Sequence, residues 1–140
     1  MDKVLIDTDV ILDFFLDRSP YADHAAEVLG LSETGKINAY VTPVMISNCY
    51  YILRKTAKHD KVVHSLKLLL TIVDVVSMDQ KAVLNALNSK FKDLEDALQH
   101  FSAKNEKDIK IILTRNVKDY KESTIAVMTP EIYLKTISKN

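Results

Sequence analysis

Short apolar runs alternate along the whole chain with longer segments in which apolar and polar positions are mixed. The runs are rich in β-branched residues and have few polar interruptions, which is typical of strands covered on both faces of a parallel sheet. Strands that alternate with helices favour an α/β fold with right-handed crossovers. The predicted strands are Lys3–Asp7, Ile37–Val41, Val73–Ser77, Ile109–Thr114 and Ile125–Met128.

The segments between the runs have helical patterns. Each of the three prolines follows a Ser or a Thr, a pair that suits the N-cap and the first residue of a helix. Helices are therefore expected to begin near Pro20, Pro43 and Pro130, and Gly35 is expected to end the first of these. The other helical patterns cover Val10–Leu16, Tyr21–Ser32, Val44–Ala57, Lys61–Ile72, Gln80–Ser89 and Glu95–Lys104.

Composition narrows the class of protein. The 140 residues are 47% hydrophobic and 27% charged, which is the balance of a single globular domain over residues 1–140. The one cysteine, Cys49, excludes an internal disulfide and a multi-cysteine zinc site. The first apolar run is too short for a signal peptide, and Ser65–Val76 is too short and too charged for a membrane span. We therefore expect a cytoplasmic protein with no membrane partner.

Charge is distributed unevenly, although the formal net charge is zero. Residues 1–35 hold eight acidic and two basic side chains, whereas the remainder holds 17 basic and 11 acidic ones. A neutral total can hide an acidic pole and a basic surface, so a nucleic-acid partner is not excluded. Uneven solvation charge is the alternative explanation.

Polar side chains follow two of the predicted strands at the point where each strand ends. Asp7 follows the first strand, Asn116 follows the fourth, and Asp119 comes three residues later. In open α/β sheets, function gathers beyond the carboxyl ends of the strands. These side chains are therefore expected to share one rim of the sheet.

A second acidic group lies at the head of a predicted helix. Asp93 and Asp96 are three residues apart and share a face of that helix. Asp93 is also a good N-cap, so capping is the alternative explanation for this pair. Carboxylates brought together repel one another unless a cation neutralises them, and Mg²⁺ or Mn²⁺ prefers oxygen ligands. Such an ion can orient a phosphodiester and activate water, which predicts a metal-dependent site.

Four stretches of the chain carry a shared pattern: residues 4–13, 93–99, 113–120 and 127–131. Their order and spacing resemble the PIN-domain family, many of whose members are toxins of the VapC type. The resemblance implies a three-layer α/β/α sandwich around a mainly parallel sheet of four to five strands. It also implies a Mg²⁺- or Mn²⁺-dependent endoribonuclease, with an antitoxin partner and a homodimer. Asp7, Asp96 and Asp93 would be catalytic metal-site acids, with Asp93 as a neighbour or supplementary ligand like Asn116 and Asp119.

Two positions depart from the family pattern. Asn48 stands where the family usually has a glutamate, and Asn116 stands where many relatives carry aspartate. An amide can offer a neutral oxygen but no negative charge, so cation binding is expected to be weaker. Asp93 or Asp119 would then have to compensate. A degenerate PIN fold that binds RNA or a protein partner, with little or no nuclease activity, is therefore an open alternative.

Substrate binding is expected to involve four residues near the rim. Arg115 adjoins the rim, and Arg54 lies on the same predicted helix as Asn48, so both are candidates to hold RNA phosphates. Surface solubility explains Arg54 equally well. Asn48 would face the substrate, and Thr8 either orients a ligand or caps the first helix.

Asp9, Asp13 and Asp17 are spaced by four residues and form one stripe on the first helix. We interpret this stripe as a solvated face, although Asp9 lies close enough to Asp7 to reach the site.

The segment from Val4 to Asp9 also looks like the opening motif of haloacid-dehalogenase-like phosphatases, in which the first aspartate is a nucleophile. Thr42 imitates the second motif of that class. The class also needs a lysine and a late pair of acids, however, and Arg115 and Asn116 follow the late strand here. The metal-dependent nuclease is therefore the favoured hypothesis, with activated water rather than a side chain as its nucleophile.

Overall fold

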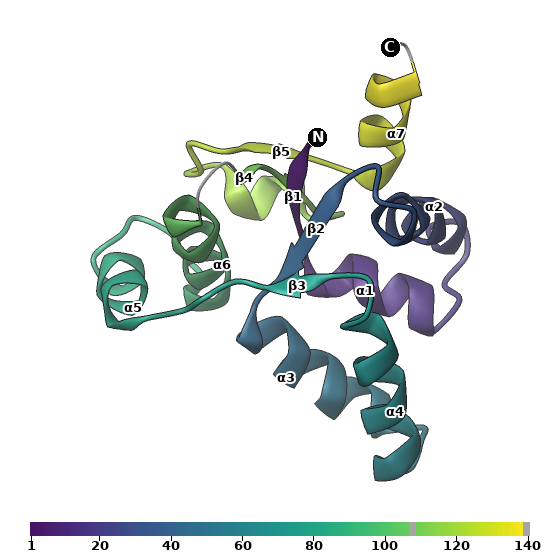
Figure 1. Ribbon diagram of the computed structural model, residues 1–140. Helices are drawn as coiled ribbons and strands as arrows, with labels where there is room; N and C mark the ends of the chain where they lie inside the picture. The colour runs from purple at the N-terminus through teal and green to yellow at the C-terminus, as the bar shows by residue number, and fades with distance from the viewer. Residues whose placement is uncertain (107–108, 139–140) are drawn as a thin grey trace.

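The computed structural model describes residues 1–106 and 109–138. Five strands form one sheet in the order β3-β2-β1-β4-β5, and every neighbouring pair is parallel (Figure 1). This confirms the predicted parallel sheet. The strands are β1 (Lys3–Ile6), β2 (Asn38–Val41), β3 (Asp74–Val75), β4 (Ile109–Leu113) and β5 (Ala126–Met128).

Helices cover the sheet on both sides, which confirms the three-layer α/β/α sandwich. In Figure 1, α5 and α6 lie on one side of the strands, and α1, α2 and α7 lie on the other. No helix in the two described ranges combines the length and the apolar character that a membrane crossing requires. The helices are α1 (Thr8–Phe15), α2 (Ala22–Glu33), α3 (Pro43–Leu53), α4 (His59–Leu69), α5 (Gln80–Leu87), α6 (Leu94–Asn105), the 3-10 helix η1 (Val117–Tyr120) and α7 (Pro130–Ser138).

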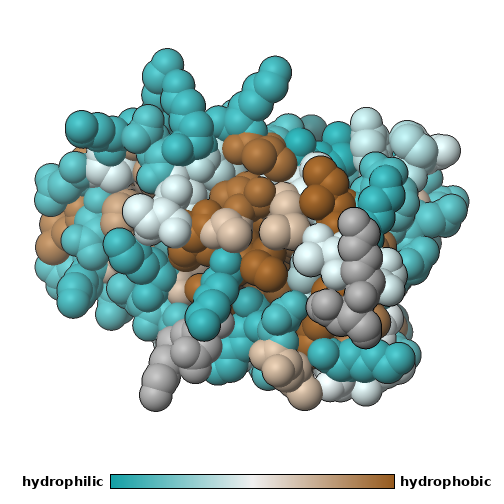
Figure 2. Space-filling view, turned by 90° about the horizontal axis from the view of Figure 1, so that it is seen from above, coloured by the Kyte–Doolittle hydropathy of each residue, from teal (hydrophilic) through white to brown (hydrophobic). Residues whose placement is uncertain are grey.

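The apolar runs form strands because the sheet buries both of their faces. Val4, Leu5 and Ile6 in the central strand β1 have no exposed surface, so the run is continuously apolar instead of alternating. Figure 2 views the molecule from above, where apolar side chains gather near the middle of the face with hydrophilic ones around them. The sheet therefore forms the centre of the core.

The pairing of β1 with β4 sets the position of the site. Ile6 is in register with Leu113, and the Asp7 N–H donates to the Leu113 carbonyl at 2.9 Å. The residues that follow these two strands therefore leave the sheet side by side, as the rule for parallel strands predicts.

Two of the three predicted helix starts are confirmed. The Thr42 hydroxyl accepts a hydrogen bond from the Met45 N–H at 3.1 Å, and α3 begins at Pro43 as predicted. The Thr129 hydroxyl accepts from the Ile132 N–H at 3.2 Å at the start of α7. Gly35, with φ of 77°, follows the end of α2 in the left-handed conformation that glycine adopts without a steric penalty.

The third helix also begins close to Pro20, but the predicted cap by Ser19, with Pro20 as the first helical residue, is wrong. The helix begins at Ala22, after an N-cap at Tyr21 that has no side-chain cap. The Arg18 carbonyl accepts from the N–H groups of Tyr21 and Ala22 at 2.9 and 2.8 Å. A backbone carbonyl therefore does what the Ser19 hydroxyl was expected to do.

Candidate active site

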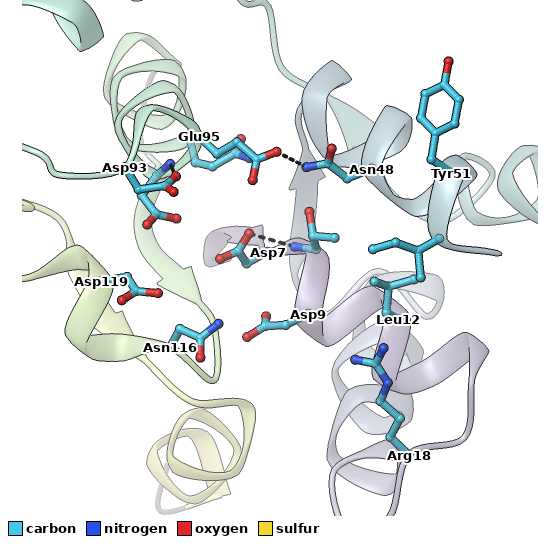
Figure 3. A pocket seen from close by; sticks show the side chains of 14 residues that line it. Asp7, Asp9, Leu12, Arg18, Asn48, Tyr51, Asp93, Glu95, Asn116 and Asp119 are labelled. Carbon is cyan, nitrogen blue, oxygen red and sulfur yellow. Dashed lines mark hydrogen bonds between the residues drawn. The ribbon is translucent and has the colours of Figure 1, made fainter. Parts of the chain in front are cut away.

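A polar cavity of about 530 Å³ opens where β1 and β4 end. Its walls come from the start of α1, from α3, from the start of α6 and from the η1 region (Figure 3). All five predicted metal-site residues line it, together with Thr8 and Asn48. The structure thus brings together side chains that are far apart in the sequence. The lining residues are Asp7, Thr8, Asp9, Leu12, Arg18, Asn48, Tyr51, Ile52, Asp93, Glu95, Asp96, Gln99, Asn116 and Asp119.

Asp7 stands at the base of the cavity, between β1 and α1. Its carboxylate caps α1 by accepting the Thr8 N–H at 2.8 Å, and its other oxygen accepts the Tyr120 hydroxyl at 3.0 Å. Burial raises the pKa of Asp7 from 3.8 to about 6, and the neighbouring charge of Asp9 adds to this effect. Among the described residues, no Lys, Arg or His forms an ion pair with Asp7, so its negative charge is not neutralised by a neighbouring base.

Asp9 is a second carboxylate of this site, and it was not among the predicted site residues. The Arg115 N–H donates to Oδ2 of Asp9 at 2.9 Å, and the Thr114 hydroxyl donates to the same oxygen at 3.2 Å. Burial raises the pKa of Asp9, and these hydrogen bonds oppose the rise. The loop after β4 thus orients an acid from α1 into the cavity.

The capping explanation for Asp93 is confirmed, and its role at a metal site stays a prediction. Oδ1 of Asp93 accepts the Asp96 N–H at 3.1 Å, so Asp93 is the N-cap of α6, and it also lines the cavity. The pKa of Asp96 is raised to about 7, first by burial and then by the charges of Asp93, Asp7 and Asp119. Asp96 and Asp7 therefore share one electrostatic environment, as the sequence predicted.

Asn48 of α3 and Glu95 of α6 close one side of the cavity. The Asn48 amide donates to Oε1 of Glu95, a contact visible in Figure 3. Glu95 lies in the acidic stretch that suggested the site, but it was not among the predicted site residues. The neutral Asn48 amide of α3 is therefore hydrogen-bonded to the negatively charged Glu95 of α6.

The geometry agrees with comparisons to known proteins. The model of the PIN-domain family matches residues 3–118. The chain belongs to the PIN-domain family. A curated relative of this PIN domain is Ribonuclease VapC1 from Aquifex aeolicus (strain VF5), which is 30% identical over 135 residues, or 93% of this chain and 92% of the relative. The haloacid-dehalogenase-like alternative is therefore set aside.

Solved structures share the fold of this PIN domain at low sequence identity. A toxin–antitoxin complex from Klebsiella pneumoniae is 20% identical, with a TM-score of 0.68 over 91% of this chain and 97% of that chain. VapBC-1 from nontypeable Haemophilus influenzae is 10% identical, with a TM-score of 0.66 over 92% and 98%. VapBC2 from Rickettsia felis, bound to a DNA fragment from its promoter, is 12% identical, with a TM-score of 0.65 over 91% and 98%.

The donor set of this PIN domain suits a hard divalent cation. Its acids offer only oxygen ligands, and Arg18 is the single Lys or Arg among the described residues of the lining. Thr8 lines the same cavity, and its hydroxyl oxygen is buried with no hydrogen-bond partner among the described residues. Among the described residues, no three His, Cys, Asp or Glu side chains are already grouped tightly enough to hold an ion.

Two predicted substrate-binding residues of this PIN domain do not line the cavity. The Arg115 guanidinium contacts Asp13 at 2.7 and 3.0 Å and lies 4.0 Å from the centre of the Tyr21 ring. Arg54 donates to the Ala57 carbonyl at 3.0 Å. The solvated-face interpretation is wrong for Asp13, which is only 1% exposed because it pairs with Arg115.

The wall facing the acids is aromatic and basic, and sequence analysis did not identify it. Tyr51 is 67% exposed at one end of this wall, and Arg18 lies at the other, with Leu12 between them in Figure 3. The sequence pattern of α3 predicts a helix at Tyr51 but not which face of that helix borders the cavity.

Proposed function

We propose that this PIN domain is a divalent-metal-dependent endoribonuclease that hydrolyses RNA phosphodiesters. The observation that carries the proposal is the shared cavity of Asp7 and Asp96, whose raised pKa values reflect burial beside other carboxylates. Mutually repelling carboxylates in a site of oxygen ligands are favourable for Mg²⁺ or Mn²⁺. The similarity to a protein named Ribonuclease VapC1 supports RNA as the substrate.

Asp7 and Asp96 would hold the cation, with Asp9, Asp93 and Asp119 supplying further negative charge from the cavity wall. When bound, the ion supplies activated water and stabilises the leaving oxygen. Tyr120 donates to Asp7 and keeps its carboxylate in one orientation. A fixed orientation is what a metal ligand needs, because outer hydrogen bonds orient the ligands of a metal.

Glu95 would offset the missing charge at Asn48. Because the Asn48 amide donates to Glu95, the carboxylate lies within hydrogen-bond reach of the position where the family usually has a glutamate. Asn116 can contribute a neutral oxygen from the opposite side of the cavity. The cavity would therefore keep enough negative charge to bind a cation, although Asn48 and Asn116 are neutral.

The substrate would lie across the wall opposite the acids. Arg18 can attract an RNA phosphate, and the exposed ring of Tyr51 can stack on an unpaired base. Thr8 would face the substrate from the cavity wall. Base stacking on an exposed ring favours single-stranded or looped RNA over a continuous duplex.

The proposed setting is that of a toxin controlled by an antitoxin. Solved structures with this fold include a toxin–antitoxin complex and VapBC assemblies. We propose by analogy a protein antitoxin as partner, a homodimer, and a cytoplasmic location where RNA is available.

The test is cleavage of a structured RNA with Mn²⁺ present, by the wild type and by Asp96→Asn. The wild type should cleave, and the variant should lose nearly all activity. The matched control is Asp60→Asn, which removes one exposed charge from α4, away from the cavity. Equal activity of the wild type and Asp96→Asn would remove Asp96 from the mechanism. RNA binding without cleavage by the wild type would favour the degenerate PIN fold.

A further inference from the structure

An ion pair between buried Asp13 and partly exposed Arg115 lies one helical turn from Asp9 and has no part in the function proposed so far. Asp13 is 1% exposed and follows Asp9 by one turn of α1. Arg115 holds both of its oxygens, with Nε 2.7 Å from Oδ2 and Nη2 3.0 Å from Oδ1. The Tyr21 ring packs against the guanidinium, and Arg18 Nη1 lies 3.6 Å from Asp13. Two parallel bonds fix the plane of the guanidinium as well as its position.

The same arginine contacts the cavity through its main chain. Its backbone N–H donates to Asp9 at 2.9 Å, and the preceding Thr114 hydroxyl donates to the same oxygen. The hydrogen bonds to Asp9 therefore come from neutral donors, and the guanidinium charge acts on Asp9 only from a distance. A guanidinium placed on Asp9 would instead neutralise that carboxylate and compete with a bound cation.

We infer that Asp13 is a positioning residue, which engages the Arg115 guanidinium so that only the main chain of Arg115 contacts Asp9. The pair also anchors the loop over residues 114–116, because the Asn116 N–H donates to Thr114 at 3.0 Å. The inference rests on the proposed function in one respect: Asp9 and Asn116 are taken to serve the metal site. If the Asp13 charge were removed, the Arg115 guanidinium would be free to turn toward Asp9, to which the backbone N–H of the same residue already donates.

The experiment compares Asp13→Asn with the double variant Asp13→Asn/Arg115→Met. The matched control is Asp17→Asn, which removes an exposed charge at a positive-φ position that asparagine tolerates. Asp17 lies beyond the end of α1 at Phe15, so the predicted helical stripe does not extend to it. Hydrogen exchange of the Arg115 amide is measured without metal, and the Mn²⁺ affinity is measured from the rise in unfolding temperature.

Asp13→Asn should speed exchange of the Arg115 amide about tenfold, because a charge-assisted anchor of the loop is lost. It should weaken Mn²⁺ binding roughly 10- to 100-fold, because the released guanidinium can then pair with Asp9 and compete with the cation. The double variant should recover most of the Mn²⁺ affinity, because methionine fills similar space without a charge that can reach Asp9. Asp17→Asn should match the wild type.

Unchanged exchange and unchanged Mn²⁺ affinity in Asp13→Asn would overturn the inference. So would a double variant as weak as the single one, because that is the result expected from general loosening of the structure. If Asp13→Asn does not fold, Arg115→Lys decides, since lysine keeps the charge but cannot hold both oxygens. Arg115→Lys should speed hydrogen exchange of the amide at position 115, and exchange at the wild-type rate would refute the inference. If the wild type neither binds Mn²⁺ nor cleaves RNA while exchange still responds to Asp13, the proposed function fails and the positioning role stands.

Discussion

Replacing Asp7 with asparagine should stabilise the metal-free protein at neutral pH. The ionised carboxylate is unfavourable in the fold, since burial and the charge of Asp9 raise its pKa from 3.8 to about 6. A difference of this size corresponds to about 3 kcal/mol between the folded and unfolded states once the group is ionised. Asparagine removes the charge but keeps the N-cap of α1, and its amide can donate to the Tyr120 oxygen.

The sign of the pH dependence follows from the direction of the shift. Near pH 4 Asp7 is protonated in the folded state and only partly ionised in the unfolded chain, so wild type and Asp7→Asn should differ little in their free energies of unfolding. Between about pH 4 and pH 6 the unfolded wild type ionises at Asp7 while the folded wild type keeps the proton, so the wild type loses stability over this range and the loss levels off above pH 6. The variant should therefore become more stable by up to about 3 kcal/mol at pH 8.

The assay is urea unfolding in EDTA at pH 4 and at pH 8, with the free energy taken from linear extrapolation. Asp60→Asn is again the control, because it removes an exposed charge and should change stability by less than about 0.5 kcal/mol. With saturating Mn²⁺ the order should reverse, because a ligand stabilises only the protein that binds it. An Asp7→Asn variant that is less stable than the wild type at pH 8, or a difference that ignores pH, would refute the electrostatic account.

Other predictions concern the walls of the cavity and the core. Tyr51→Ala should raise the KM for single-stranded RNA roughly 10-fold with kcat retained, and Tyr51→Phe should not, because stacking needs only the ring. Arg18→Gln should weaken RNA binding and reduce its salt dependence by about one phosphate contact, measured as the slope of log affinity against log salt concentration. Glu95→Gln, which can still accept from α3, should lower Mn²⁺ affinity about tenfold in a thermal titration. Ile112→Ala should cost about 3 kcal/mol in urea unfolding because Ile112 is fully buried, whereas Ile132→Ala, at an exposed position, should cost less than about 0.5 kcal/mol. Wild-type values in any of the first four variants, or equal losses in the two isoleucine variants, would contradict the role assigned to that residue.

The sheet could be predicted because a strand buried on both faces needs apolar residues at consecutive positions, and such runs are visible in the sequence. The run Val4-Leu5-Ile6 is apolar at consecutive positions, and only a strand covered on both faces needs this. Once β1 and β4 are parallel neighbours, Asp7 and the residues after Leu113 must leave the sheet at the same rim. This part of the site therefore follows from strand order alone.

The remainder depended on packing that sequence spacing does not specify. Four-residue spacing places Asp9 and Asp13 on one face of α1, but it does not show that the loop after β4 packs against that face. Arg115 was predicted to bind phosphate because it adjoins the rim, yet its side chain turns back to Asp13. The helix start after Ser19 also differs, because the Arg18 carbonyl occupies the capping role.

The central claim is that a divalent cation binds between Asp7 and Asp96. Crystals soaked in Mn²⁺ and measured near the manganese absorption edge test this directly. The account predicts an anomalous peak with oxygen ligands from both carboxylates, and no peak there in crystals of Asp7→Asn. Empty density between the two carboxylates, at a Mn²⁺ concentration that supports RNA cleavage in solution, would contradict it.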